Sequence, residues 1–533
     1  MQKTIIMARR IVSVFLCFTL VALICFCRVY LVGKSETKVN NIQNGYTLSV
    51  GRLRGTIFDC NMQPITNAKT KIMAAVLPTP RAITAISAVL PREKLDNVLE
   101  ALRGGKPVLV ELERELDCEG IINLKVPEYV GENTPCEHLI GYLDNAGHGV
   151  SGIEKAYDKY LYSNQKIEVI YPSDALGNFL VGDQAEVIYD QSVIYSGVAL
   201  TIDSELQRRT EEAMRQVKSG AAVVVEVSTG KIRAMVSAPS FDLTQIEDYL
   251  NGENSPLVNR ALSAYNVGSA FKPCVAAALL ENGGYTTYEC NCSGSTLIDL
   301  HRFNCHKLVG HGRVNLSEAL SESCNVFFYK ISALLGAEPI YKMAKKLSFS
   351  SSIDLRGIST AAGSIDTLES LKSRPTILAN LAIGQGELLL SPVSILTLYE
   401  AIACGGVYSM PTVVEGVVEK GIIKREKVAP KTRAMSEQTA DKIKEYLLGV
   451  VESGTGTAAR PDYVSAAGKT ATAETGWRKD GRLIQNSWFC GFFPYENPKY
   501  VVSVLIEDEK QNGTSGAPIF KKIADGIAQF EGL

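Results

Sequence analysis

The chain has 533 residues, of which 46% are hydrophobic and 21% charged, as in a folded protein with two or three domains rather than in a disordered chain. Its formal net charge of −2 gives no basic surface, so we expect no nucleic-acid partner. The chain contains only five histidines, which disfavours a histidine-based catalytic triad and leaves lysine as the available base.

The first 33 residues have the pattern of a membrane anchor. Basic residues precede an apolar run over 11–27, which Arg28 separates from a second apolar run over 29–32. If Arg28 snorkels to the interface, the span reaches about 20 residues, enough to cross a bilayer. No small-residue cleavage site follows the run, so we expect an uncleaved anchor over 1–33 rather than a cleaved signal peptide. The basic flank predicts that everything after the anchor is extracytoplasmic.

Residues 34–198 predict a second unit of the α+β class. Short alternating apolar runs mix with charged helical stretches such as 93–103, and no catalytic cluster is evident. Two segments stand out, a glycine-punctuated strand over 52–59 and a turn before a helix over 138–154. Local structure alone accounts for both of them.

The pattern changes at residue 199. Asp203 or Ser204 is a candidate N-cap for a helix, and Ser228-Thr229-Gly230 joins two β-rich runs as a hairpin turn. The predicted strands are residues 221–227, 231–237, 488–493 and 500–506, and the predicted helices include 205–217 and 519–530. Because strands lie at both ends of this region with helices between them, we expect one antiparallel sheet covered by helices, an α+β fold.

Ser269 and Lys272 form a Ser-x-x-Lys motif at the start of a helix-like run over 271–280. Residues three apart on a helix face the same way, so the lysine can act as a base for the serine hydroxyl. This requires that the lysine pKa fall from about 10.4 toward neutrality, through burial or a nearby cation. Lys469 is the candidate cation.

The Ser-x-x-Lys spacing alone is a weak signal. It also occurs at Ser228 and Lys231, on the predicted hairpin turn. A capped surface helix with a snorkelling lysine would show the same pattern at Ser269 and Lys272. The assignment therefore depends on further motifs downstream.

Cysteine and histidine residues gather between 290 and 311. Cys292 and Cys305 flank a loop and can form a disulfide outside the cell, with Cys290 as a competitor. Histidines at 301, 306 and 311 share this stretch, so a zinc site is the alternative. The spacing matches no paired Cys-x-x-Cys pattern, and we expect neither a metal ion nor an organic cofactor.

Ser323-Cys324-Asn325 lies between a helix-like stretch over 316–320 and an apolar run over 326–329. A short polar turn here can place Ser323 as a proton relay to a leaving amine and Asn325 against a substrate amide. A helix cap is the local alternative, because serine and asparagine both favour caps.

Lys469-Thr470-Ala471-Thr472 begins a strand-like run. A strand edge at this point can pair with an extended peptide, with Thr470 binding the terminal carboxylate and Lys469 attracting it. A backbone N–H near Thr472, together with that of Ser269, can form an oxyanion hole.

These three motifs resemble, in order and spacing, those of the penicillin-binding proteins, specifically the class B, monofunctional transpeptidases. The similarity covers nearly the full length of the chain. Further matching segments are residues 54–59, 149–154, 238–242, 384–386, 454–458 and 488–491.

The resemblance implies a transmembrane helix within 1–33, an elongated pedestal domain of the dimerisation type over 34–198, and a serine D,D-transpeptidase/β-lactamase-like domain over 199–533. It implies that a peptidoglycan stem peptide acylates Ser269 through its penultimate D-Ala and that a neighbouring stem's amine then takes the acyl group. β-Lactams would acylate the same serine.

The resemblance also implies roles for the other motif residues and for partners. Lys272 would be the base, Ser323 and Asn325 the relay and substrate-binding pair, and Lys469 and Thr470 the carboxylate site. No cofactor is implied. The expected partners are a membrane glycosyltransferase and cell-envelope assembly proteins.

Two features keep other functions open. Ala471 replaces the glycine usual in the third motif, and we expect its methyl group to lie where the substrate backbone passes, so that Ala471→Gly would speed acylation. A Glu-x-x-Leu-Asn string, a mark of β-lactamases, occurs at 247–251 but lies before Ser269 and is treated as chance. The alternatives are a D,D-carboxypeptidase or β-lactamase on the same fold, or a weakly active scaffold or sensor.

Overall fold

The computed structural model describes the chain except for residues 1, 35–44, 175–178, 180–184, 284–286 and 480. The chain begins with helix α1 (Gln2–Lys34). Its segment Val12–Tyr30, 19 residues, is long and apolar enough to cross a membrane. At 1.5 Å per residue this segment spans about 28 Å, close to the thickness of a hydrocarbon core.

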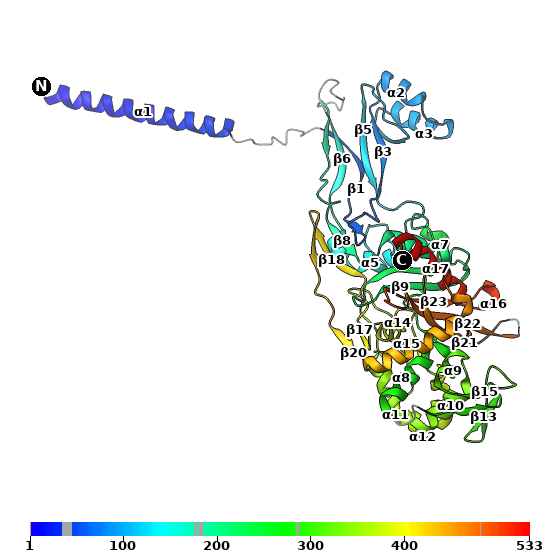
Figure 1. Cartoon of the computed structure of the whole chain (residues 1–533). Helices are drawn as coiled ribbons and strands as arrows, with labels where there is room; N and C mark the ends of the chain where they lie inside the picture. Colours follow the sequence, from blue (N-terminus) through cyan, green and yellow to red (C-terminus); the bar gives the residue numbers. More distant parts are fainter. Residues whose placement is uncertain (1, 35–44, 175–178, 180–184, 284–286, 480) are drawn as a thin grey trace.

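Two antiparallel three-stranded sheets form the end of the molecule that is blue and cyan in Figure 1. The first has the order β1 (Gly45–Arg52), β6 (Lys166–Pro172), β7 (Glu186–Ile188), and the second β4 (Val108–Leu112), β3 (Lys69–Val76), β5 (Ile121–Glu128). Helices α2 (Pro80–Ser87) and α3 (Arg92–Arg103) pack their apolar side chains against the second sheet, and α3 confirms the helix predicted over 93–103. We call these two sheets and their helices the head.

A four-stranded sheet joins the head to the larger body. Its order is β19 (Ile422–Arg425), β18 (Val414–Glu419), β8 (Gly197–Leu200), β2 (Thr56–Phe58), and only the β2–β8 pair among these strands is parallel. The sheet therefore combines strands from three distant parts of the chain. The expected boundary between residues 198 and 199 falls inside β8.

The two segments that stood out at 52–59 and 138–154 meet beside this sheet. Arg54 is buried and donates from Nε to Glu154 Oε2 at 2.8 Å, and its other nitrogens donate to Asp158 Oδ1 and the Gly147 carbonyl, both at 2.8 Å. Glu154 lies in the short helix α5 (Gly152–Ala156), and Asp158 begins the next short helix, α6 (Asp158–Leu161). These segments are therefore two halves of one buried ion-pair network.

The larger body is built on an antiparallel five-stranded sheet. Its order is β10 (Ile232–Ala238), β9 (Gly220–Glu226), β23 (Tyr500–Ile506), β22 (Arg482–Phe493), β21 (Ala467–Lys479). Helices α7 (Ser204–Met214) and α17 (Gly516–Glu531) cover one face, while α8 (Lys272–Asn282) and α14 (Leu396–Ala403) cover the other. The predicted antiparallel sheet from both ends of the region is thus confirmed.

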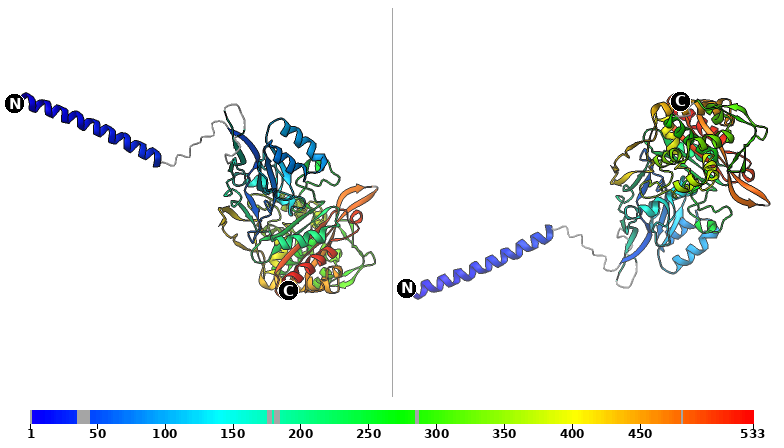
Figure 2. Two further views of the ribbon diagram at one scale, coloured as in Figure 1. Left: turned by 90° about the horizontal axis from the view of Figure 1, so that it is seen from above. Right: turned by 90° about the horizontal axis from the view of Figure 1, so that it is seen from below.

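The predicted element boundaries hold to within a few residues in most cases. Asp203 is the N-cap of α7, because its side chain accepts from the N–H groups of Glu205 and Leu206. Strand β22 begins six residues earlier than the predicted 488–493, and its distal hairpin with β21 projects beyond the body in both views of Figure 2.

The remaining helices and strands complete the body. The helices are α9 (Leu316–Ser321), α10 (Asn325–Leu335), α11 (Ala337–Lys346), α12 (Leu368–Ser373), α13 (Pro375–Ala382), α15 (Glu437–Glu452) and α16 (Glu509–Asn512), with α4 (Glu137–Ile140) before them. The 3-10 turns are η1 (Ile246–Tyr249), η2 (Gly268–Phe271) and η3 (Thr457–Ala459). The strand pairs are β11 (Tyr265–Asn266) with β16 (Leu389–Leu390), β12 (Cys290–Cys292) with β15 (Gly312–Val314), β13 (Ser295–Ile298) with β14 (His301–Asn304), and β17 (Val407–Ser409) with β20 (Lys431–Arg433).

Candidate active site

Ser269 lies in the η2 turn, which continues directly into α8. The turn is fixed from two sides: the Gly268 N–H donates to the Gly384 carbonyl at 2.9 Å, and the Tyr399 hydroxyl donates to the Ala270 carbonyl at 3.0 Å. The serine oxygen is therefore presented by a supported backbone at the beginning of a helix.

Lys272 is fully buried at the first turn of α8. Its Nζ donates to the Ser323 carbonyl and to Asn325 Oδ1, both at 2.7 Å, and to Ser323 Oγ at 3.1 Å. Burial lowers the pKa of Lys272 from 10.5 to about 7, with the nearby Cys324 and Cys305 acting weakly in the opposite direction. The amine can thus be neutral near physiological pH, and burial rather than a neighbouring cation is the main cause.

Ser323 connects the lysine to the nucleophile. Its Oγ donates to Ser269 Oγ at 3.1 Å while accepting from Lys272. Ser323 lies between α9 and α10 with a left-handed φ of 54°, an uncommon conformation for a residue with a side chain. Such strained positions are common in functional sites, where surrounding contacts maintain them.

The third motif lies on strand β21 next to the η2 turn. Lys469 is fully buried and its Nζ donates to the Thr470 carbonyl at 3.2 Å; burial and the nearby Lys272 lower its pKa, while Glu322 opposes the shift. The Thr472 carbonyl lies against Gly268, where a Cβ would come within 2.8 Å of it. The three motifs therefore meet in one place.

The sequence model described as "Penicillin binding protein transpeptidase domain" matches residues 220–525, more than half of the chain. The chain belongs to this family. Among curated proteins it is 29% identical to "Stage V sporulation protein D" of Bacillus subtilis (strain 168), over 90% of this chain and 76% of that protein. It is also 29% identical to "Peptidoglycan D,D-transpeptidase PbpA" of Mycobacterium tuberculosis (strain CDC 1551 / Oshkosh), over 63% of this chain and 73% of that protein.

Solved structures share the fold. The apo form of penicillin-binding protein 3 from Mycobacterium tuberculosis superimposes with a TM-score of 0.67 and 22% identity, over 92% of this chain and 98% of that one. The expected resemblance is confirmed: the chain is a class B penicillin-binding protein, a serine-type transpeptidase.

The side chain of Ala471 does not lie where the sequence analysis expected it. Along β21, Thr472 is exposed and Thr470 is partly exposed, whereas Ala471 is only 5% exposed and packs in the main hydrophobic core. Side chains alternate between the faces of a strand, so the methyl group points away from the face that carries the two threonines. The burial of the methyl group therefore argues against the expected obstruction of a substrate strand, and the effect of Ala471 on acylation stays a prediction.

Two residues in matched family segments support the site, although the sequence analysis gave them no role. Gly384 accepts the hydrogen bond from Gly268, and a Cβ at position 384 would lie 1.9 Å from the Gly268 carbonyl oxygen. Thr455 places its hydroxyl 2.9 Å from that of Thr470 and donates its N–H to the Ser321 carbonyl. The matched segments drew attention to this glycine and this threonine. The sequence alone did not show which backbone groups they contact.

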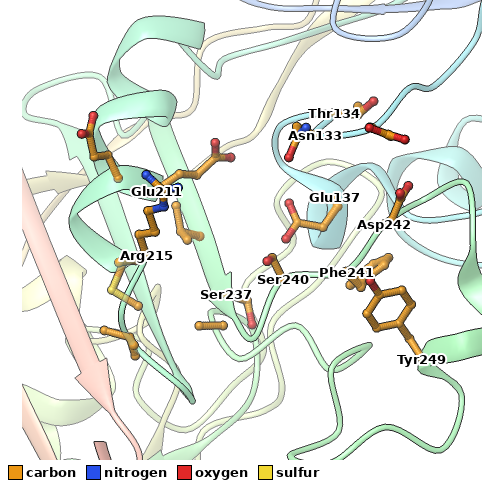
Figure 3. Close-up of a pocket in the computed structure, with 16 residues that line it drawn as sticks. Asn133, Thr134, Glu137, Glu211, Arg215, Ser237, Ser240, Phe241, Asp242 and Tyr249 are labelled. Carbon is orange, nitrogen blue, oxygen red and sulfur yellow. The ribbon is translucent and has the colours of Figure 1, made fainter. Parts of the chain in front are cut away.

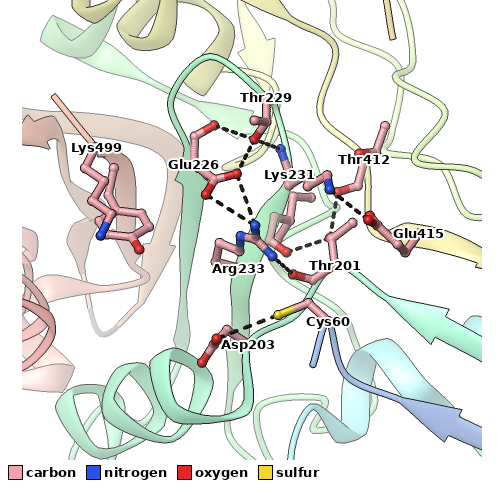
Figure 4. Close-up of polar contacts among 12 residues, drawn as sticks. Cys60, Thr201, Asp203, Glu226, Thr229, Lys231, Arg233, Thr412, Glu415 and Lys499 are labelled. Atoms are coloured by element: carbon pink, nitrogen blue, oxygen red, sulfur yellow. Dashed lines mark hydrogen bonds and ion pairs between the residues drawn. The ribbon is translucent and has the colours of Figure 1, made fainter. Parts of the chain in front are cut away.

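The second Ser-x-x-Lys match, at Ser228 and Lys231, is structural as expected. It lies at the β9–β10 hairpin, where Lys231 pairs with Glu415 at 2.8 Å (Figure 4). The Thr229 hydroxyl donates to Glu226 within the same turn. Near it, Cys60 Sγ donates to Asp203 Oδ2 at 3.7 Å.

The candidate disulfide between Cys292 and Cys305 is absent: all thirteen cysteines lie in the described part of the chain and all are free. Cys290, the expected competitor, is also free. The sulfur atoms of Cys292 and Cys305 instead converge with His311 and Cys324.

A cavity of about 660 Å³ lies away from the three motifs (Figure 3). Residues 132–137, helix α7 and the end of β10 line it, with Glu137, Glu211 and Asp242 among the acidic side chains that point toward it. None of the lining residues belongs to the Ser269 site. Its acidic lining does not suit a substrate with a terminal carboxylate.

Proposed function

We propose that this penicillin-binding protein cross-links peptidoglycan stem peptides through an acyl-enzyme on Ser269. The observation that carries the proposal is the link from Ser269 through Ser323 to Lys272, a buried amine whose pKa lies near 7. The name of the related PbpA, a peptidoglycan D,D-transpeptidase, supports the substrate.

In the first half-reaction Ser269 Oγ attacks the carbonyl carbon of the penultimate D-Ala. Its proton passes through Ser323 Oγ to the neutral Lys272 amine, as the hydrogen bonds between these groups allow. Backbone N–H groups of Ser269 and Thr472 stabilise the developing oxyanion. Collapse of the tetrahedral intermediate breaks the peptide bond, and the leaving D-Ala nitrogen takes the proton back from the lysine through the same relay.

In the second half-reaction the amine of a neighbouring stem attacks the ester. It loses a proton to Lys272, and the lysine passes that proton through Ser323 to Ser269 Oγ as the ester bond breaks. The serine hydroxyl and the neutral amine are both restored, so the enzyme returns to its starting state. A lysine with a pKa near 7 can perform both proton transfers at neutral pH, because its two protonation states are then close in free energy.

The remaining motif residues bind the donor peptide. Asn325 Oδ1 accepts a hydrogen bond from Lys272, so the Asn325 Nδ2 can donate to a substrate carbonyl. Lys469 and Thr470 recognise the terminal carboxylate, and Thr472 lies exposed on the same face as Thr470. No metal or cofactor takes part in these steps.

We further infer that β-lactams acylate Ser269 as mimics of the donor peptide. Related structures of Mycobacterium tuberculosis penicillin-binding protein 3 are described in complex with aztreonam and with ampicillin. The β-lactam carboxylate would occupy the place of the peptide's terminal carboxylate at Lys469 and Thr470.

We also propose the arrangement of the chain at the membrane. Helix α1 anchors it by a single pass over 1–33, and an extracytoplasmic pedestal (34–198) carries the transpeptidase domain (199–533). A membrane glycosyltransferase would supply the glycan strands. Cell-envelope assembly partners are supported by a solved complex of Helicobacter pylori PBP2 with MreC, which shares this fold at a TM-score of 0.66.

Labelling of the full-length protein with a fluorescent penicillin tests the site. We expect stable labelling of the wild type and none of Ser269→Ala, while Ser228→Ala, in the hairpin Ser-x-x-Lys, labels normally. Rapid loss of the label would favour a β-lactamase, and an unlabelled wild type would favour a scaffold. Incubation with a stem pentapeptide and an amine acceptor then separates cross-linked product, which we expect, from the hydrolysed peptide of a carboxypeptidase.

A further inference from the structure

Four side chains that could bind a metal ion meet directly behind the second motif. They are Cys292 at the end of β12, Cys305 after β14, His311 before β15, and Cys324 at the N-cap of α10. Their ligand atoms, the three sulfurs and a ring nitrogen, all lie within 4.8 Å of one another. The three cysteines are buried and the histidine is half-buried.

Two of the distances between the ligand atoms match those of a tetrahedral centre. His311 Nδ1 lies 3.5 Å from Cys292 Sγ and 3.6 Å from Cys305 Sγ. A zinc ion with Zn–S bonds of about 2.3 Å and a Zn–N bond of about 2.0–2.1 Å separates its sulfur and nitrogen ligands by about 3.6 Å. The His311 ring therefore stands where a tetrahedral ion between these atoms would need it.

The backbone holds the ligands without help from the metal. The His311 N–H donates to the Cys292 carbonyl at 3.0 Å, and the Cys305 N–H donates to the Gly294 carbonyl at 2.8 Å. At Gly310 a Cβ would lie 2.1 Å from the Cys292 carbonyl oxygen, so only glycine allows this close approach. These contacts fold the loop between β12 and β15 back on itself and aim its side chains at one point.

A disulfide does not explain the cluster as well. It would use two thiols and leave a third buried beside them, together with the His311 ring nitrogen Nδ1 that faces the sulfurs. Thiols accept hydrogen bonds only weakly, so the imidazole gains little from them. Three thiolates and one imidazole are a ligand set of structural zinc sites, and soft thiolates exclude magnesium and calcium.

We propose that Cys292, Cys305, His311 and Cys324 bind one Zn²⁺ ion. This ion links the 290–314 loop to the turn between α9 and α10, which carries Ser323. On binding, each thiol loses its proton to solvent and forms a bond from sulfur to zinc. Three thiolates and Zn²⁺ leave one net negative charge on the centre. The sequence expectation of no metal depended on a local Cys-x-x-Cys spacing, whereas these ligands come from segments that only the fold brings together.

The ion would position catalytic residues although it takes no part in the chemistry. Cys324 lies between Ser323, whose backbone has a left-handed φ, and Asn325, and both neighbours bind Lys272. A bond from Cys324 to zinc fixes this turn from behind. This effect on acylation rests on the proposed function, whereas metal binding itself does not.

Metal content tests the binding step. We expect the full-length protein, purified without added metal or chelator, to contain about one zinc ion per chain. Inductively coupled plasma mass spectrometry measures this content. Cys292→Ser and His311→Ala each remove one of the four protein ligands and should each lose most of the zinc during purification. Cys290→Ser, a buried cysteine on the same strand that is not part of the cluster, should keep its zinc.

Two further measurements make the result independent of variant folding. The wild-type protein exchanged into Co²⁺ should show a thiolate-to-cobalt charge-transfer band and the d–d bands of a tetrahedral site. Peptide mapping under non-reducing conditions should find no Cys292–Cys305 disulfide. A wild type without zinc, zinc that survives in Cys292→Ser, or a disulfide between these cysteines would overturn the proposal; iron or copper in place of zinc would overturn the choice of metal.

The positioning role has its own readout. Removal of the metal by a chelator should slow penicillin acylation by at least about tenfold, and added Zn²⁺ should restore the rate, while Cys290→Ser behaves as wild type. If zinc is present but its removal leaves the rate unchanged, the positioning role is wrong. If the protein binds zinc but is never acylated, the proposed function is wrong and the proposal of a metal site still holds.

Discussion

The hydroxyl oxygens of Ser269 and Ser323 lie 3.1 Å apart, although 54 positions separate the two residues in the chain. Ser323 Oγ in turn accepts a hydrogen bond from Lys272. Among the described hydrogen bonds of Lys272, this is the one that leads on to the nucleophile. The reactivity of Ser269 therefore depends on the turn between α9 and α10 as much as on its own helix.

Ser323→Ala should slow acylation of Ser269 by a β-lactam by about 10²–10⁴-fold, the range expected for loss of a proton-transfer group. Lys272 keeps its bonds to the Ser323 carbonyl and Asn325, so the variant should fold. Stopped-flow labelling with a fluorescent penicillin measures the rate. Ser332→Ala, which removes a buried hydroxyl bonded to the Tyr329 carbonyl, is the control and should acylate normally. A normal rate in Ser323→Ala would exclude the relay.

Acylation should depend on pH through Lys272. The base is the neutral amine, and burial lowers the pKa of Lys272 to about 7, so the protonated and inactive form dominates below that pH. The acylation rate should therefore fall about tenfold for each pH unit well below 7 and level off above about 8. Rates measured from pH 5 to 9, with thermal unfolding followed over the same range, give the profile. A midpoint near 10 would mean that the lysine is not buried during the reaction.

Gly384→Ala should displace the turn that carries Ser269. Position 384 has a φ of +72°, and the new Cβ would lie 1.9 Å from the Gly268 carbonyl oxygen. Gly386→Ala is a matched control, because its φ is +82° but no atom lies closer than 3.7 Å to its new Cβ. Both changes carry the backbone cost of roughly 1–2 kcal/mol for a left-handed alanine. Only Gly384→Ala should also reduce the acylation rate, by at least tenfold; equal rates in the two variants would show that this contact does not position Ser269.

Ala471→Gly should lower stability without speeding acylation. The methyl group is buried in the core, so its removal and the added backbone freedom should cost about 1–2 kcal/mol of unfolding free energy. The acylation rate should stay within about threefold of wild type, since the methyl group is on the opposite face of β21 from Thr470 and Thr472. Denaturant unfolding and penicillin labelling measure the two effects. Faster acylation would mean that residue 471 contacts the substrate after all.

The sequence predicted the local structure of each motif well where the motif had a periodic context. The strand and helix patterns around Ser269, Ser323 and Lys469 placed each motif on the element that carries it. The same alternation along β21 also contained the answer for Ala471, because its partly or fully exposed threonines at 470 and 472 fix which face is polar. The family resemblance drew attention to the missing glycine and away from this pattern.

Contacts between distant segments could not be predicted in this way. Arg54 and Glu154 are 100 positions apart, and each lies in a segment that local structure seemed to explain fully. The cluster of Cys292, Cys305, His311 and Cys324 depends on the pairing of β12 with β15 and on the position of α10, which no local spacing encodes. Hydrophobic periodicity reports which face of an element is buried but not which polar groups meet there.

The Arg54 network provides a test of what stabilises the segments beside the four-stranded sheet. Arg54 and Glu154 have exposed fractions of 7% and 1%, so loss of Arg54 leaves the Glu154 charge buried without its ion-pair partner, with only the Tyr129 hydroxyl to bond it. Arg54→Met should therefore lower the unfolding free energy by about 3–5 kcal/mol, whereas Arg54→Met combined with Glu154→Gln should recover part of the loss. Arg81→Met is the matched control: Arg81 pairs with Glu119 in the same region, but the two are 78% and 62% exposed, and its loss should cost less than about 1 kcal/mol. Urea unfolding followed by circular dichroism measures all three. Similar losses for Arg54→Met and Arg81→Met would show that water reaches Glu154 and that the network contributes little to stability.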